Sequence, residues 1–230
     1  MSALVKNNIL ILSDGIGAEL LESAVRRVNR GADIVCVFTA AQLEAECRKR
    51  SRDLLLSFRT GIIVPESALV PFGRFAVNFH AAPPEFPGRD PHHFAHYHGA
   101  RSYGATAHIM RGKVDAGPIV GVERCDISAD ARPIDYLAAA NSAAERLIDR
   151  LVPRLVFGQQ IPELECSWGP IKTTRKDFID LCRVTPLMEK SEFDRRKAAV
   201  EMGDFQNLFV EIHGHRFRID LSSEKDGSWT

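Results

Sequence analysis

Short apolar runs alternate with amphipathic stretches through the first 80 residues of the chain. Four of these runs predict β-strands, at residues 9–12, 32–39, 53–58 and 74–80. Apolar residues at helical spacing predict helices over residues 16–30 and 41–50. Strands that alternate with helices are typical of a mostly parallel sheet with helices on both faces. We therefore expect an α/β protein built on a mostly parallel, twisted sheet.

The pattern changes after residue 90. Residues 91–99 predict a helix, and residues 100–110 and 118–127 predict two strands joined by a short turn. Two strands across a short turn indicate an antiparallel addition to the parallel sheet. Residues 133–158 form the longest helical stretch, and we expect Pro153 to break or kink it because proline lacks the backbone N–H.

From about Gln160 the sequence becomes loop-like and then changes character. Two short helices are predicted within residues 176–184 and 190–202, followed by a hairpin within residues 207–220 whose tip is His213-Gly214-His215. We therefore predict a main domain over residues 1–159 and a small C-terminal α+β segment over residues 160–230.

Composition narrows the class of protein. The 230 residues are 45% hydrophobic, which is enough apolar material for a full core. Lys plus Arg equals Asp plus Glu at 30 each, so no long-range positive field favours nucleic acid. The five scattered cysteines contain no C-x-x-C pair and indicate reduced thiols. With no signal peptide or membrane-length apolar run, we expect a soluble cytoplasmic protein that binds neither membrane nor nucleic acid.

A strand that runs into a proline-rich loop is the first candidate for chemistry. In the stretch VNFHAAPPEFPGRDP, Asn78 and His80 are two residues apart and would face the same side of a strand. The prolines that follow fix the direction of the loop. The residues alone leave two interpretations open. A histidine here is either a hydrogen-bonded packing residue, the commoner role, or a catalytic base.

A second candidate is Asp115, which lies on a turn between two predicted strands and is either an ordinary turn residue or a catalytic carboxylate. Asn78, His80 and Asp115 together would supply an oxyanion-stabilising amide, a base and its orienting acid. No serine or cysteine nucleophile stands among them. The set therefore favours direct attack by a substrate nucleophile on a bound acyl donor.

Two further motifs are weaker evidence for a functional site. Six of the eight histidines lie between residues 80 and 108, and His92 and His96 are one helical turn apart, as metal ligands can be. A further ligand is missing, so solvated or core-edge histidines are favoured over a metal site. Gly15-Ile16-Gly17 lacks the third glycine of a dinucleotide fingerprint, and a tight strand-to-helix turn is favoured over NAD binding.

The segments N-F-H, the proline-rich turn with its glycine, and G-A-T-A-H six residues before D-A-G-P-I-V resemble a known family. They are similar to the formyltransferases that use N10-formyltetrahydrofolate, over roughly residues 9–150. The resemblance implies a Rossmann-like formyltransferase fold, and Asn78, His80 and Asp115 as catalytic residues. His108 matches a motif position without a firm role. The implied formyl donor is N10-formyltetrahydrofolate, and no metal is implied.

The resemblance also implies where the folate binds. The pterin would pack beside Ile63, Val64 and Pro65, and against the loop of Met110, Arg111, Gly112, Lys113 and Val114. Gly88 matches the family's glycine after the proline turn. Ala82 and Pro83-Pro84 depart from the family's serine and leucines, which puts acceptor recognition more in doubt than the chemistry.

The C-terminal segment points to the acceptor. It is similar to the short tail of the nucleotide-sugar N-formyltransferases, which implies a nucleotide-linked amino sugar as acceptor and a setting such as lipopolysaccharide O-antigen biosynthesis. We expect His108, Gly88, Trp168 and Lys172 to contact substrate, and for Trp168 the alternative is a packing residue that pins the tail to the core. Alternatives are a formyltransferase of the glycinamide ribonucleotide or methionyl-tRNA type, an inactive folate- or nucleotide-binding relative, and a metal-dependent hydrolase. A homodimer is left open.

Overall fold

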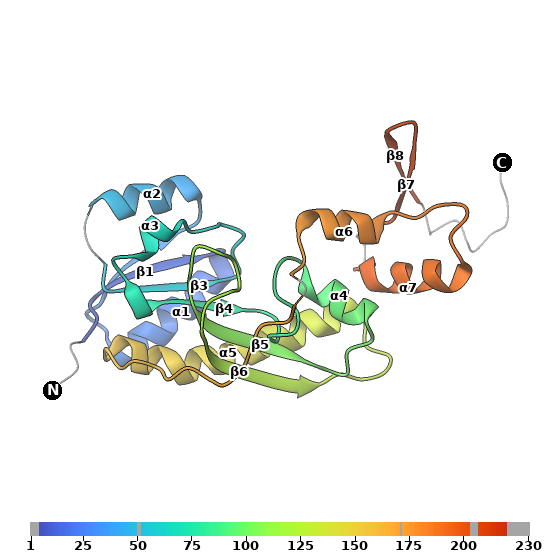
Figure 1. Cartoon of the computed structure of the whole chain (residues 1–230). Helices are drawn as coiled ribbons and strands as arrows, with labels where there is room; N and C mark the ends of the chain where they lie inside the picture. The colour runs from blue at the N-terminus through green and yellow to red at the C-terminus, as the bar shows by residue number, and fades with distance from the viewer. Residues whose placement is uncertain (1–4, 50–51, 171, 203–206, 220–230) are drawn as a thin grey trace.

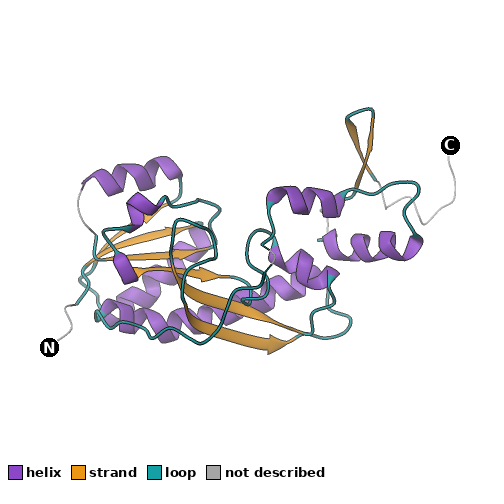
Figure 2. Cartoon of the chain, in the orientation of Figure 1, coloured by secondary structure: helices purple, strands orange, loops and turns teal. Residues whose placement is uncertain are grey.

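A six-stranded sheet in the order β2-β1-β3-β4-β5-β6 forms the centre of the protein. The computed structural model describes residues 5–49, 52–170, 172–202 and 207–219. The first four strands of that order are parallel, and β5 and β6 are antiparallel additions. The predicted fold class, a mostly parallel α/β sheet with an antiparallel addition and a small C-terminal appendage, is confirmed (Figures 1 and 2).

The sheet and the elements around it follow the predicted order along the chain. Its strands are β1 (Asn8–Ser13), β2 (Asp33–Val37), β3 (Leu54–Phe58), β4 (Ala76–His80), β5 (Ser102–Ile109) and β6 (Ile119–Asp126). The helices of this part are α1 (Gly15–Val28), α2 (Ala40–Lys49), α3 (Glu66–Leu69), the short η1 (Gly73–Phe75), α4 (Pro91–Tyr97) and α5 (Pro133–Val156).

Each face of the sheet has its own apolar core. Alternate strand residues such as Ile11, Leu56 and Phe79 pack with α1 and α5 on one face. The residues between them, such as Leu10 and Leu55, pack with α2 and α3 on the other. This division follows from the twofold alternation of side chains along a strand. It leaves the strand ends, where the apolar alternation stops, free for polar side chains.

The long helix α5 continues through Pro153 to Val156, so of the predicted break or kink at this proline the break is wrong and the kink stays a prediction. Pro153 lies in the last turn, where few helical residues follow the lost N–H hydrogen bond. The helix runs beneath the sheet along its length (Figure 1). Its buried alanines, among them Ala140, Ala143 and Ala144, let the backbone approach the strands closely.

The C-terminal part packs against α4. Helices α6 (Arg175–Cys182) and α7 (Lys190–Val200) form a third apolar cluster with Phe94 of α4. The predicted hairpin is present as β7 (Phe209–Ile212) and β8 (His215–Arg218), and it projects from the body of the molecule (Figure 1). Its turn residues His213 and Gly214 have φ of 50° and 80°, the two positive values that a tight hairpin turn of this type requires.

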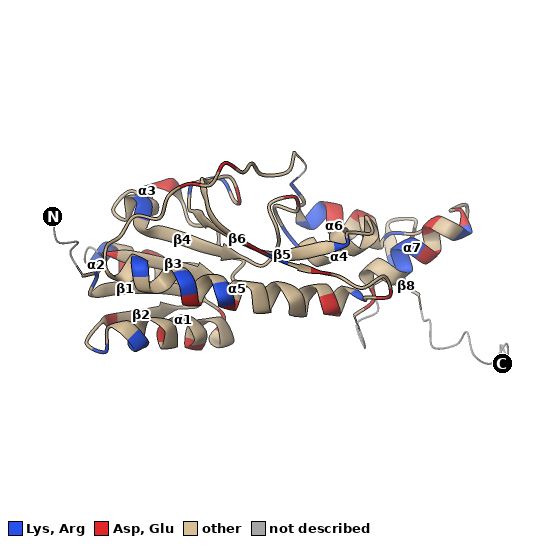
Figure 3. Ribbon diagram, turned by 90° about the horizontal axis from the view of Figure 1, so that it is seen from below, with Lys and Arg blue, Asp and Glu red and all other residues tan. Residues whose placement is uncertain are grey.

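Charge is mixed over the surface. Figure 3 shows basic and acidic positions interspersed on the face it presents, in keeping with the formal net charge of zero. In the described part of the chain, no helix is both long and apolar enough to cross a bilayer.

Candidate active site

The carboxyl end of β4 places two polar side chains at the edge where the parallel strands end. Asn78 and His80 alternate with Val77 and Phe79, which are buried in the core beneath α1 and α5. Asn78 and His80 therefore face the opposite side of the sheet. This edge is where open α/β sheets bind their ligands.

Strand β5 brings His108 to the same place. Antiparallel pairing sets His108 directly opposite Asn78, and Nδ2 of Asn78 lies 3.1 Å from Nε2 of His108. Cross-strand partners of this kind share a face of the sheet. The family resemblance implied no firm role for His108, and we expected it only to contact substrate; the structure places it inside the polar network with Asn78.

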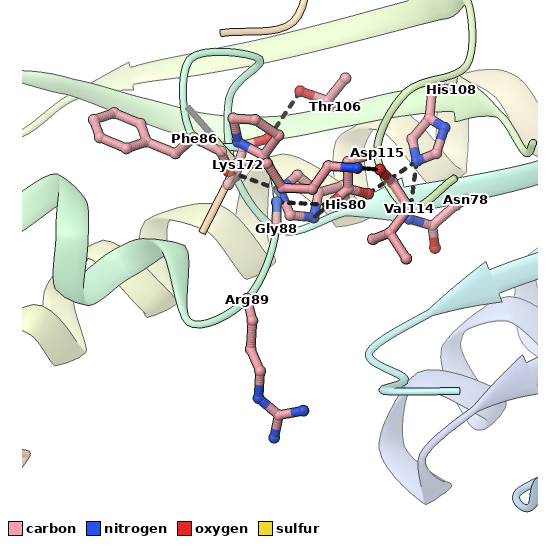
Figure 4. A network of polar contacts seen from close by, with 12 residues as sticks. Asn78, His80, Phe86, Gly88, Arg89, Thr106, His108, Val114, Asp115 and Lys172 are labelled. Atoms are coloured by element: carbon pink, nitrogen blue, oxygen red, sulfur yellow. Dashed lines mark hydrogen bonds and ion pairs between the residues drawn. The ribbon is translucent and has the colours of Figure 1, made fainter. Parts of the chain in front are cut away.

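Asp115 lies between two imidazoles. Its Oδ1 is 3.3 Å from Nε2 of His108, and its Oδ2 is 3.6 Å from Nδ1 of His80. The same Oδ2 accepts a 2.8 Å hydrogen bond from the backbone N–H of Gly88. The side chain is only 4% exposed. The fold therefore brings the predicted residues Asn78, His80 and Asp115 together with His108 in one network (Figure 4).

The backbone of Asp115 has a φ of 42°, in the left-handed region. Aspartate adopts this conformation more readily than most residues. The turn before β6 is thus an unusual one, and it directs the carboxylate at the two histidines rather than at solvent. The alternative that Asp115 is merely a solvated turn residue does not fit this burial.

The pKa of Asp115 is lowered from 3.8 to about 2. Burial acts most strongly and would raise this pKa, because it disfavours the charged form. The charge of His80, the hydrogen bond and charge of His108, and the N–H of Gly88 together outweigh burial. At neutral pH, Asp115 is therefore an ionised carboxylate in contact with two imidazoles.

His80 is held by the proline-rich loop as well as by Asp115. Its Nε2 lies 3.1 Å from the carbonyl oxygen of Phe86, and its Nδ1 faces Asp115. Both ring nitrogens thus face oxygen atoms. The loop that the prolines stiffen supplies a direct contact to the candidate base.

Gly88 closes the same loop over Asp115. Its φ is 102°, and a Cβ atom at this position would lie 2.1 Å from the carbonyl oxygen of Thr173. Both the backbone conformation and the close approach therefore require glycine. The predicted substrate-binding role of Gly88 stays a prediction, although Gly88 does line the pocket described next.

A pocket of about 420 Å³ opens beside this network. Among the residues that line it are Asn78, His80, His108 and Asp115, the loop Thr60–Val64 after β3, the loop Met110–Val114, Arg89, and the segment Lys172–Arg175. All the residues predicted to hold the folate line this pocket except Pro65. Pro65 instead lines a neighbouring hollow next to α2.

Residues 160–170 and 172–174 return along β6 to the site, so this part of the predicted appendage lies against the main domain. The backbone N–H of Leu164 donates to the carbonyl oxygen of Ile119 at 2.8 Å. Thr173 forms a parallel bridge with Gly88, and the ammonium of Lys172 donates to the carbonyl oxygen of Val114. Lys172 thus lines the pocket as expected, while the boundary at residue 160 stays a prediction.

The predicted contact of Trp168 with substrate stays a prediction. Trp168 does not line the pocket, and its ring packs edge-on against His80 and His108 instead. Arg89 and Thr173 are among the pocket residues that were missed. Arg89 adjoins the recognised glycine of the loop and points away from the network into open space (Figure 4). Thr173 offered no sequence signal, because its role depends on contact with a loop over 80 residues away.

The remaining histidines of the cluster stay apart from the site. Nδ1 of His93 lies 2.7 Å from the carbonyl oxygen of Ala199 and joins α4 to α7. His92 packs on His93, and burial lowers the pKa of His92 to about 3. Within the described ranges of the chain, no group of three or more His, Cys, Asp and Glu side chains is placed to hold a metal ion.

Comparisons with known proteins agree with this geometry. The Formyl transferase family model matches residues 39–151. A formyltetrahydrofolate deformylase from Corynebacterium sp. (strain P-1) is 30% identical over 73 residues, which are 32% of this chain. The match spans only 26% of that relative's length.

Two solved structures show the same fold over nearly the whole chain. A candidate sugar N-formyltransferase from Mycobacterium tuberculosis has a TM-score of 0.75 at 23% identity, covering 94% of this chain and 96% of that one. An N-formyltransferase from Helicobacter canadensis has a TM-score of 0.66 at 14% identity, covering 92% and 86%.

Residues 39–151 therefore match the Formyl transferase family, and the N-F-H and D-A-G-P-I-V segments both lie within this match. Over nearly its whole length the chain has the fold of the solved N-formyltransferases.

Proposed function

We propose that the protein transfers a formyl group from N10-formyltetrahydrofolate to the amino group of a nucleotide-linked amino sugar. The observation that carries this proposal is the buried Asp115 carboxylate in contact with two imidazoles on the wall of the pocket. Asn78 completes that wall with an amide. These are the parts needed to stabilise a carbonyl oxygen as it gains charge and to move one proton.

Asn78 supplies the donor toward the carbonyl oxygen. An amide has two N–H bonds, so at least one of them remains for the pocket when Nε2 of His108 accepts from Asn78. A hydrogen bond that strengthens as charge builds on that oxygen is typically worth about 3 kcal/mol of barrier. Nε2 of His108 has either a proton or a lone pair, so it donates to Asp115 or accepts from Asn78, but not both.

His80 handles the proton. The amine of the acceptor loses a proton as it attacks the formyl carbon, and the nitrogen that leaves on the folate gains one. His80 lies at the pocket with Asp115 behind it, which stabilises the charged imidazole during this transfer. To reach substrate, His80 would exchange its contact with the carbonyl oxygen of Phe86 for one with the reacting groups.

The donor fits one side of the pocket. Ile62, Ile63 and Val64 offer apolar contact, and the backbone of Met110–Val114 offers hydrogen-bonding groups that suit the amide edge of a pterin. The Helicobacter canadensis structure holds folinic acid together with dTDP-3-aminofucose. That pair of ligands supports a folate donor and a nucleotide-sugar acceptor for the fold that this chain shares.

The acceptor fits the basic side of the pocket. Arg89, Lys172 and Arg175 line it there, and they would attract a diphosphate. Thr174 caps α6 beside them, with Asp177 completing the capping box. The proposed acceptor is thus defined by two chemical features, a primary amine at His80 and a diphosphate near these three cations.

The deformylase match favours a second candidate, in which water replaces the amine and formate is released. The same carboxylate and imidazoles would serve that hydrolysis. The experiment is to incubate the protein with N10-formyltetrahydrofolate and a panel of dTDP-, UDP- and GDP-linked amino sugars. Mass spectrometry of the sugar and an enzymatic formate assay are read in parallel.

A formamide that appears with one sugar nucleotide and needs His80 supports transfer. Formate that appears at the same rate with and without every sugar would support the hydrolase instead. His80→Ala serves as the negative control in both assays. Folate that is left unchanged in all of these mixtures would contradict both activities.

A further inference from the structure

Trp168 contacts both imidazoles of the site without lining the pocket. Its ring centroid lies 5.0 Å from that of His108 with an interplanar angle of 88°, and 5.9 Å from that of His80 at 65°. Its indole N–H donates to the carbonyl oxygen of Gly117 at 2.8 Å. One side chain thus touches the two histidines and the turn that carries Asp115.

We infer that Trp168 is a positioning residue, which fixes the imidazoles of His80 and His108 on either side of Asp115. The expected effect of Trp168 on turnover rests on the proposed function. Its effect on the orientation of the two histidine rings holds whatever the reaction is. Trp168 lies outside the segment that matches the Formyl transferase family, residues 39–151. The C-terminal segment would therefore complete a catalytic centre whose other members come from the family domain.

The backbone that carries Trp168 contacts the proline-rich loop at two points. Next to the tryptophan, the N–H of Gly169 donates to the carbonyl oxygen of Pro84 at 2.8 Å. A Cβ atom on Gly169 would lie 2.5 Å from the carbonyl oxygen of Glu85, so only glycine permits this approach. Further on, Thr173 pairs with Gly88 in the same loop. The indole is therefore carried on backbone that is hydrogen-bonded to the loop holding His80.

The physical consequence concerns ring orientation and water. A histidine ring turns about its terminal torsion over a broad range unless neighbours restrict it. Edge-on aromatic contacts add an orientation preference to the apolar contact. The indole also covers the imidazoles, which keeps water from the Asp115 carboxylate and strengthens its attraction to them. Trp168 could instead anchor the tail by packing or offer a stacking face to the acceptor. Neither of these roles requires that it orient the two imidazoles or keep water from Asp115.

The test compares Trp168→Leu with Trp168→Phe, and uses Phe193→Ala as a matched control. Leucine keeps apolar bulk but has no ring, and phenylalanine keeps a ring but no N–H. Phe193 is also a half-buried aromatic of the C-terminal part, packed away from the histidines. The readouts are the ring-nitrogen NMR shifts of His80 and His108 in the free protein, the melting temperature, and kcat and KM for formyl transfer.

We expect Trp168→Leu to change the ring-nitrogen shifts of both histidines and to lower kcat by about 10- to 100-fold, the cost of misplaced catalytic groups. Trp168→Phe should retain most of the wild-type kcat and keep the ring-nitrogen shifts of both histidines close to their wild-type values. Phe193→Ala should lower the melting temperature without moving the histidine shifts. Unchanged shifts in Trp168→Leu would overturn the inference, even if no acceptor is ever formylated. Changed shifts in a protein without transferase activity would uphold it and count against the proposed function alone.

Discussion

Asn78 and His108 are direct cross-strand partners on β4 and β5, and their side chains meet at 3.1 Å. The contact joins an amide that is predicted to be catalytic to a histidine without an assigned role. Because Nε2 of His108 is also 3.3 Å from Asp115, the amide, the imidazole and the carboxylate form one chain of contacts. We therefore expect a substitution of any one of these three side chains to disturb the positions of the other two.

Removal of the amide or the base should reduce turnover far more than stability. Asn78→Ala and His80→Ala are each expected to lower kcat by about 100-fold or more, the usual range for an oxyanion donor or a general base. Steady-state kinetics with saturating folate measures this. His98→Ala, on an exposed histidine at the end of α4, is the control. Near-normal turnover in both site variants would show that neither residue takes part.

Asp115→Asn should produce a stability difference that depends on pH. The folded-state pKa of Asp115 is about 2 and its ordinary value is 3.8, so the ionised carboxylate stabilises the fold above 3.8. That shift corresponds to roughly 2 kcal/mol, which is lost as the pH falls through about 2. Urea unfolding at a series of pH values should show the gap between wild type and Asp115→Asn closing on acidification.

The control for this titration is Asp149→Asn, on an exposed carboxylate paired with Arg27. Its effect on unfolding should be small throughout, because exposed ion pairs contribute little. If the gap for Asp115→Asn were the same at every pH, the carboxylate would not be held in its charged form by the two histidines.

Gly88→Ala should destabilise the fold and impair turnover together. The positive φ alone costs about 1 kcal/mol, and strain of this kind reaches about 3 kcal/mol where the surroundings cannot give way. Here the new Cβ would lie 2.1 Å from the backbone oxygen of Thr173. Thr173 and the backbone on either side of it would have to move. Gly99→Ala is a matched control, since Gly99 has a φ of 66° with no atom within 4 Å of the added Cβ. Equal losses of stability in the two variants would contradict the role of the contact.

Arg89→Ala should weaken binding of the acceptor and leave the donor unaffected. The Arg89 side chain is 54% exposed at the pocket, where a diphosphate would meet it. We expect the KM for the sugar nucleotide to rise by roughly 10-fold at low salt, as for loss of a charge-assisted hydrogen bond. The folate KM should stay the same. Arg132→Ala, on an exposed arginine away from this pocket, should change neither. A rise in the folate KM instead would reverse the proposed placement of the two ligands.

Ile63→Ser should weaken binding of the folate at little cost in stability. Ile63 is 68% exposed, yet it lines the pocket, which is the expected position of a side chain that packs on a flat ligand. The folate KM should rise about 10-fold, as for loss of roughly 1.5 kcal/mol of apolar contact. Leu187→Ser removes an equally apolar side chain that is 94% exposed elsewhere, and it should leave the KM unchanged. Matched KM values in the two variants would place the folate away from this loop.

The sequence by itself determined the elements, the fold class and three members of the site. Apolar periodicity is a local property, so the strands and most helices could be read from neighbouring residues. The exceptions are the short helices α3 and η1, which were not predicted, and the continuation of α5 through Pro153. The pairing of Asn78 with His80 could be predicted for the same reason, because residues two apart on a strand share a face. Asp115 was found through its motif, which records a fixed spacing along the chain.

Only the tertiary structure decided where Asp115, His108 and Trp168 lie relative to one another. Nothing local indicates that Asp115 lies between two imidazoles, because those contacts depend on the pairing of β4 with β5 and on a turn with positive φ. The position of Trp168 depends on a segment that crosses β6 and returns to a loop some 80 residues earlier. Such contacts form where whole elements pack together, and a burial pattern along the chain records that a residue is covered but not which residue covers it.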